Sequence, residues 1–235
     1  MTEWLDFNGF PPECPQFYRD LSNNNNKAWF DQHKSDYERY CLIPARQFVA
    51  AMGLRLAAIS PQINAIPQVN QSLFRINRDT RFSREKIPYK THLGIVFWEG
   101  NRPRMESSCF YFQLEPDRLM LAAGIKLFSK PILDEYRRSV ADKKIGQSLL
   151  AAISEVTGRG PYYIGDVHYK KVPKGYTPAP ETAGLILHNT LYAAFETSLP
   201  QELHSTAILD YCYAHFSAMA PIHKWLAAVI DRTSS

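Results

Sequence analysis

Cysteine and long apolar runs are both scarce in this chain of 235 residues. The four cysteines are widely spaced and form no C-x-x-C pair, which argues against a zinc ribbon or a dithiol redox motif. No apolar run approaches the roughly 18–20 residues that a membrane-spanning helix needs. The N-terminal residues include Glu3 and Asp6 and no apolar core, so we expect no signal peptide. We therefore expect a cytoplasmic protein with reduced thiols and no membrane partner.

Motifs that mark common catalytic and cofactor sites are also missing. The sequence has no G-x-S-x-G nucleophile motif, no Walker phosphate loop and no dinucleotide fingerprint. Its seven histidines are far apart, and none belongs to an H-x-x-x-H or H-E-x-x-H pattern. Cys109 falls in an apolar stretch, so we interpret it as a core residue rather than a nucleophile. We predict no metal site and no cofactor.

The overall composition is that of an ordinary globular protein. Hydrophobic residues make up 45% of the chain and charged residues 21%, which is enough to bury a core without disulfide support. There is no internal repeat, and no Pro/Gly/Ser-rich linker divides the chain. We therefore predict a single domain over residues 1–235. The sequence does not indicate an oligomeric state.

Hydrophobic periodicity predicts helices at both ends of the chain and strands in its middle. The asparagine run at residues 23–26 is a helix-capping signal, so a helix should follow to about residue 41, and Pro44 should open the next one. Strands are predicted at residues 73–76, 92–98, 109–114 and 119–125, joined by short turns as an antiparallel meander. The predicted fold class is α+β, with an antiparallel sheet covered by helices.

The C-terminal half should add more helices and one further strand. Helices are predicted at residues 129–142 and 144–156, a strand or irregular hairpin at 162–172, and a short helix from residue 178. A strand should cover residues 191–197. The chain should then be helical from 201 to about 230, with a break or kink at Pro221.

One segment accounts for the net charge of +4. Residues 75–90 contain six basic and two acidic side chains, so the rest of the chain is balanced. A local concentration of charge predicts a local acidic partner rather than general adhesion to polyanions. The planar fork of arginine suits phosphate and carboxylate oxygens. We therefore predict an anion-binding loop. Its predicted ligand-binding residues are Arg75, Arg78, Arg81, Ser83, Lys86, Tyr89 and Lys90, with Trp29 from an earlier helix.

Three side chains are candidates for proton transfer beside this loop: His33, Tyr89 and His92. His33 lies on a predicted helix with Trp29 and Tyr37, each four residues apart and therefore on one face. That face could stack a ring or relay a proton next to the basic loop. It could equally pack as an aromatic stripe on the core, with His33 hydrogen-bonded at the edge. Both interpretations stay open, and so does the question of whether any reaction takes place.

The basic segment also resembles the signature of a known family. SLFRINRDTRFS at residues 72–83 continues as KIPYKTH at residues 86–92, and NNNKAWF at residues 24–30 precedes it. LEPD at 114–117, AG at 123–124 and PKGY at 173–176 follow in the expected order. Together these motifs resemble a bacterial and fungal family catalogued as domain of unknown function 2461, over about residues 10–226. The resemblance implies a fold boundary and the identity of the central motif, but no mechanism.

Three functions remain open on these grounds. The first is a site for a phosphate- or carboxylate-bearing small molecule, with or without an enzymatic step. The second is a nucleic-acid module that uses the same cations on phosphates and Trp29, Phe82 or Tyr89 to stack bases. The third is a structural or interaction protein whose Arg/Asp pairs only tie the loop to the sheet. A concave pocket would favour the first function, and a broad exposed basic stripe the second.

Overall fold

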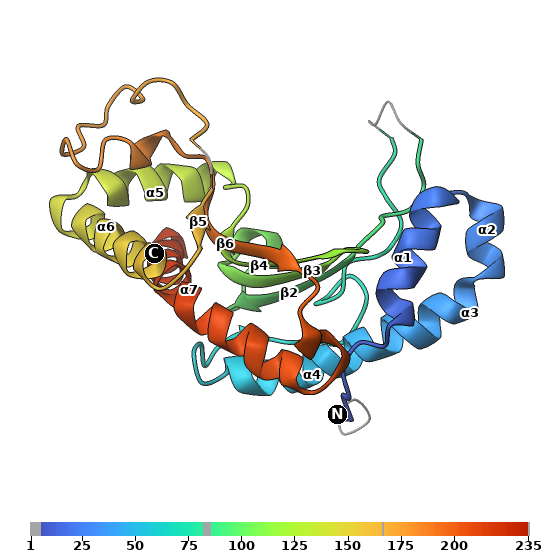
Figure 1. Ribbon diagram of the computed structural model, residues 1–235. Coiled ribbons are helices and arrows are strands. Elements are labelled where there is room, and N and C mark those ends of the chain that lie inside the picture. Colours follow the sequence, from blue (N-terminus) through green and yellow to red (C-terminus); the bar gives the residue numbers. More distant parts are fainter. Residues whose placement is uncertain (1–5, 82–85, 166, 235) are drawn as a thin grey trace. The chain divides into compact units, whose positions relative to one another are not determined.

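The computed structural model describes residues 6–81, 86–165 and 167–234 and has the predicted α+β class (Figure 1). Its antiparallel sheet has the strand order β1-β2-β3-β4-β6-β5. The strands are β1 (Ile63–Asn64), β2 (Leu93–Glu99), β3 (Cys109–Leu114), β4 (Arg118–Ile125), β5 (Tyr163–Ile164) and β6 (Leu191–Ser198). Strands β2, β3 and β4 are neighbours both in sequence and in the sheet, so the predicted meander is confirmed.

The helices follow the capping signals of the sequence. Asn26 accepts a hydrogen bond from the backbone N–H of Trp29 at 3.0 Å, and Pro44 lies in the first turn of α4. A π-helical segment, Tyr37–Leu42, leads directly into α4. The α-helices are α1 (Glu13–Asn23), α2 (Lys27–Gln32), α3 (Lys34–Asp36), α4 (Ile43–Leu56), α5 (Lys130–Ala141), α6 (Lys143–Gly158) and α7 (Ala207–Asp231).

Four local predictions differ from the structure. Of residues 73–76 only Leu73 makes bridges, so no strand forms there, and of the strand or irregular hairpin expected at 162–172 the regular strand is the two-residue β5. The short helix expected from residue 178 is replaced by turns that precede a 3-10 segment, Leu185–Leu187. Helix α7 continues through Pro221, so of the expected break or kink the break is wrong, and the kink stays a prediction. Ile222, His223 and Leu226 are buried just beyond Pro221, and their packing outweighs the lost backbone hydrogen bond.

The chain divides into two compact units that are each discontinuous in sequence. Unit 1 comprises Met1–Phe97, Tyr111–Leu121 and Glu196–Ala214. Unit 2 comprises Trp98–Phe110, Ala122–Phe195 and His215–Ser235. Strands β2, β3, β4 and β6 contribute residues to both units. The single-domain expectation stays a prediction, which coincident unfolding transitions measured by two probes would support.

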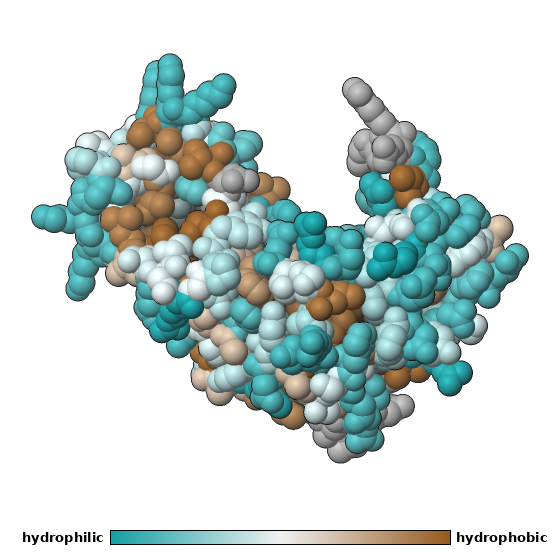
Figure 2. Space-filling model, in the orientation of Figure 1, coloured by the Kyte–Doolittle hydropathy of each residue, from teal (hydrophilic) through white to brown (hydrophobic). Residues whose placement is uncertain are grey.

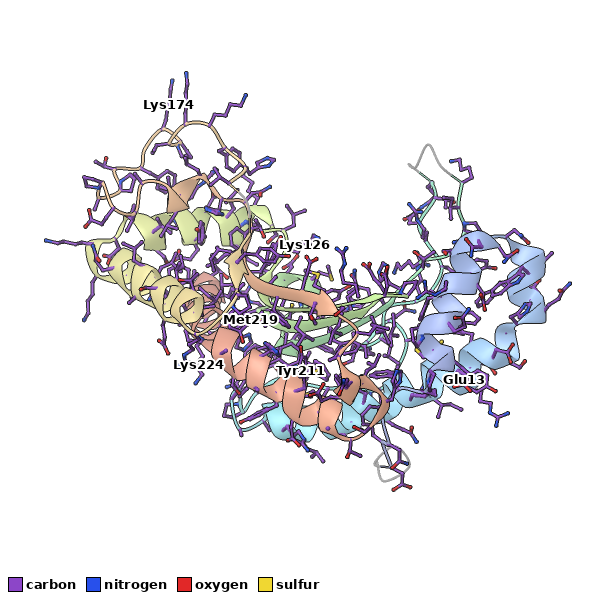
Figure 3. The ribbon with its side chains drawn as sticks, viewed as in Figure 1. Glu13, Lys126, Lys174, Tyr211, Met219 and Lys224 are labelled. Carbon is purple, nitrogen blue, oxygen red and sulfur yellow. The ribbon has the colours of Figure 1, made fainter. Side chains whose placement is uncertain are left out.

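The core of unit 1 is an aromatic cluster on one face of the sheet. Phe48 of α4 packs on Phe112 of β3 at a ring-centroid distance of 4.9 Å, and Phe10 stacks on the same ring at 5.4 Å. All three rings are fully buried. Because strand residues alternate between faces, Tyr111 and Gln113 lie on the opposite face, where they stay half-buried. Figure 3 shows side chains standing on that second face of the sheet. The second face carries the site described below.

In unit 2, helices α5, α6 and the later part of α7 pack through large aromatic side chains. Tyr136 of α5 meets Trp225 of α7 edge to face, and its hydroxyl donates to the carbonyl oxygen of Leu185 at 2.7 Å. Strands β4 and β6 approach closely at Gly124, whose φ is +134°. A Cβ at this position would lie 2.2 Å from the carbonyl oxygen of Leu191, so only glycine fits.

Candidate functional site

The basic segment forms a hairpin that leads into β2 of unit 1. Asn77 bridges Tyr89 in an antiparallel pair, with hydrogen bonds from Arg78 N to Pro88 O and from Lys90 N to Ile76 O, both 2.8 Å. Side chains of directly paired residues share a face of a two-stranded ribbon. The pairing therefore places Arg78 and Lys90 on one face and Asn77 and Tyr89 on the other. Ser83, with Phe82 and Arg84, lies outside the described residues.

Tyr89 anchors the hairpin to the N-terminal helices. Its backbone N–H donates to Asn25 Oδ1, and its carbonyl oxygen accepts from Asn25 Nδ2, both at 3.0 Å. The Tyr89 ring stacks on Phe30 of α2 at 4.3 Å and is 6% exposed. Burial, together with nearby Asp31, raises the pKa of the Tyr89 hydroxyl. These contacts favour an anchoring role for Tyr89 over proton transfer at neutral pH.

The other basic side chains of the segment include two that are engaged within the loop itself. Arg81 makes a two-pronged ion pair with Asp79, with distances of 2.7 and 3.0 Å. These hydrogen bonds, with a smaller contribution from Arg75, hold the pKa of Asp79 well below its usual range. Lys86 Nζ donates to the carbonyl oxygen of Thr80 at 2.8 Å. Arg75, Arg81 and Lys86 are all exposed to solvent.

Arg78 and Lys90, which share the hairpin face opposite Tyr89, both act electrostatically on His92. Lys90 lies 5.2 Å from the centre of the Phe74 ring, and its Nζ donates to the carbonyl oxygen of Arg75 at 2.9 Å. His92 is half-buried. Its pKa is lowered from 6.5, first by burial and then by the charges of Lys90 and Arg78, while Glu115 acts in the opposite direction. A histidine with a lowered pKa is neutral at pH 7. The structure thus combines a neutral imidazole, two cations and one carboxylate.

Trp29 and His33 share a helical face, as their spacing predicts. Their rings stack at 4.0 Å, and His33 Nδ1 donates to the Trp29 carbonyl oxygen at 2.8 Å. Trp29 also packs on Phe17 of α1, and Tyr37 turns into the core. Hydrophilic groups cover α2 and α3 on the face seen in Figure 2. These contacts agree with an aromatic stripe on the core, and it is Phe30 that meets the basic hairpin.

A buried polar network in unit 2 was not visible in the sequence. The hydroxyl of Ser108 lies 2.9 Å from His223 Nδ1, and His223 Nε2 lies 3.2 Å from Glu99 Oε2. An ionised carboxylate can only accept, so Nε2 carries the proton, and Ser108 donates to Nδ1. The order of residues resembles a catalytic triad, but Ser108 and His223 are each only 1% exposed. Such burial keeps substrate away, so the network is better explained as a structural one.

The remaining histidine and cysteine side chains of interest are His188, His223 and Cys109. His188 and His223 are both buried. Cys109 lies in β3, where its thiol donates to the carbonyl oxygen of Gly124 at 3.1 Å. Burial raises the pKa of Cys109 to about 12, which disfavours the thiolate form that a nucleophile needs. Within the described residues, no group of three or more His, Cys, Asp or Glu side chains is arranged to hold a metal ion.

The fold and the site together define an α+β protein that presents a basic hairpin beside a half-buried histidine. The chain belongs to the DUF2461 family of conserved hypothetical proteins, whose sequence profile matches residues 13–225. This match confirms the family resemblance and covers nearly all of the predicted region. A comparison with curated proteins finds no match. Among the residues that the structure describes, no helix is long and apolar enough to cross a bilayer.

Proposed function

We propose that the His92 side of the hairpin binds a small phosphate- or carboxylate-bearing ligand through Arg78 and Lys90. The observation that carries the proposal is that Arg78 and Lys90 share one face of the hairpin and that both charges act on the half-buried His92, against the carboxylate of Glu115. Like charges on one face of the hairpin repel each other, and a bound anion offsets that repulsion. Each charge-assisted hydrogen bond to the anion contributes about 1.5–3 kcal/mol.

His92 is the group we propose to exchange a proton with the ligand. In the apo protein its pKa is lowered by burial and by the neighbouring cations. A bound anion acts in the reverse direction and brings the pKa back toward neutrality, where histidine is an effective general acid or base. Anion binding would therefore make His92 a better proton donor near neutral pH than it is in the apo protein.

The test is an NMR titration of the His92 ring with and without sulfate. Sulfate mimics a phosphate group but does not itself titrate near neutral pH, and acetate serves as the carboxylate probe. We expect sulfate to raise the pKa of His92 in the wild type and to lose this effect in Arg78→Ala and Lys90→Ala. Lys90→Ala should also raise the pKa of His92 without any anion, because it removes one of the charges that lower it.

The exposed Arg39→Ala, also in unit 1, is the matched control and should leave the response intact. The local NMR readout matters because sulfate stabilises most proteins by exclusion from their surface, so a rise in melting temperature alone is ambiguous. A wild-type His92 titration that neither sulfate nor acetate changes would remove the support for this function.

Nucleic-acid binding is the second candidate, and the exposure of Arg75, Arg81 and Lys86 favours it. Phosphate contacts of this kind make affinity fall steeply with salt. Arg81→Ala separates the candidates, because it should weaken RNA or DNA binding and leave the sulfate response of His92 unchanged. The Asp79–Arg81 pair and the Lys86–Thr80 hydrogen bond also favour the third function, a structural or interaction protein in which these charges only support the fold.

A further inference from the structure

A row of polar side chains runs along β3 beside the proposed anion site. Tyr111, Gln113 and Glu115 are two residues apart, so they share the half-buried face of the strand. The Tyr111 hydroxyl donates to Gln113 Oε1 at 2.7 Å, and Gln113 Nε2 donates to Glu115 Oε1 at 2.6 Å. Both ends of the Gln113 amide are engaged, so the amide orientation is fixed. The carboxylate of Glu115 is thus held in a defined position.

Aromatic contacts join this row to Lys90. The rings of Phe74 and Tyr111 meet edge to face at 6.0 Å, and Lys90 lies over the Phe74 ring. Gly94 of β2 makes room for both rings, because a Cβ there would lie 3.1 Å from the Tyr111 hydroxyl and 3.2 Å from Phe74 Cδ2. In unit 1 a continuous row of contacts therefore runs from Lys90 over the rings of Phe74 and Tyr111, and through Gln113, to the carboxylate of Glu115.

Glu115 is an unexpected neighbour for a site that binds a simple anion. Its charge repels any anion held by Arg78 and Lys90, and it acts on His92 in the direction opposite to those cations. Among the described residues Glu115 makes no ion pair, since the neighbouring Arg118 instead pairs with Glu196 at 3.2 Å. A carboxylate that is held by an amide and not neutralised by a cation is suited to accept from a donor on a ligand.

We infer that the ligand is a small acid that also carries an amino group, with the acid held by Arg78 and Lys90 and the amino group donating to Glu115. The apolar carbons between the two groups would lie over Phe74 and Tyr111. This inference rests on the proposed anion site and adds the second recognition point. It assigns Glu115 a binding role that the charge pattern of the basic segment alone does not suggest.

Calorimetric titration with a matched pair of ligands tests the inference. Aminoethyl phosphate and ethyl phosphate present the same anion and differ only in the amino group. One charge-assisted hydrogen bond predicts that the wild type binds aminoethyl phosphate roughly 10- to 100-fold more tightly. Glu115→Gln should abolish this preference while it retains the binding of ethyl phosphate. Asp117→Asn removes an exposed acid from the same turn and should keep the preference.

The outcomes separate the two proposals. Equal wild-type affinity for the two phosphates would overturn the amino-group inference and leave the anion site standing. An unchanged preference in Glu115→Gln, or its loss in Asp117→Asn, would show that Glu115 is not the specific acceptor. Binding of neither phosphate by the folded wild type would overturn the anion site and this inference with it.

Discussion

Replacing Ser108 by alanine removes the hydroxyl that donates to Nδ1 of His223 at 2.9 Å. Both residues are 1% exposed, so no solvent reaches the vacated hydrogen bond. Nδ1 then loses this donor in a buried position, which costs about 1–3 kcal/mol of the free energy of unfolding. For a chain of this size each kcal/mol lowers the melting temperature by roughly 2–4 °C.

The adjacent serine provides a matched control for this substitution. Ser107 is also buried, but its hydroxyl donates only to backbone carbonyl oxygens, at 3.3 and 3.5 Å. Hydrogen bonds of that length are weak, so Ser107→Ala should cost less than about 1 kcal/mol. Urea unfolding of the two variants measures the difference directly, and the nitrogen chemical shifts of His223 report which ring nitrogen carries the proton.

Equal stability of the two variants would contradict the reasoning, because it would mean that the Ser108–His223 hydrogen bond contributes nothing beyond a shared burial effect. A proton on Nδ1 of His223 in the wild type would contradict it as well. The tautomer argument depends on Glu99 accepting from Nε2 at 3.2 Å, and the opposite tautomer would leave Ser108 as an acceptor.

Two further predictions concern pH and the hairpin anchor. Burial lowers the pKa of His223 by more than Glu99 raises it. The neutral histidine therefore contributes fully to stability above its unfolded pKa of about 6.5, and this contribution is lost as the pH falls below that value. The free energy of unfolding should therefore decline from neutral to acidic pH less steeply in His223→Gln than in the wild type, by up to about 1.4 kcal/mol per pH unit. Equal slopes in the two proteins would refute this. Asn25→Ala removes the partner of the backbone N–H and C=O of buried Tyr89 and should lower the free energy of unfolding by about 1–3 kcal/mol. Replacement of the exposed Asn23 by alanine should be nearly neutral, and thermal unfolding distinguishes the two variants.

The elements with strong local signals could be predicted closely from the sequence. Strand β3 was predicted at its exact bounds, because Phe110, Phe112 and Leu114 alternate with half-buried residues and Pro116 stiffens the turn that follows. The capping role of the asparagine run was also predicted, since a side-chain oxygen needs only the next turn of backbone. Where the outcome depended on packing, as at Pro221, the sequence did not decide between a break and a continuous helix, because distant contacts stabilise the helix there.

The amino-acid sequence alone determined the α+β class, the family and the concentration of positive charge in one segment, because composition, alternation and motif spacing are properties of neighbouring residues. Only the tertiary structure decided which cations share a face of the hairpin. The pairing of Asn77 with Tyr89 sends Arg78 and Lys90 to one side, and Arg81 pairs with Asp79. It also brought Glu115 to the electrostatic neighbourhood of His92. Side-chain direction on a ribbon depends on register, and register is set by contacts across the fold that no stretch of sequence displays.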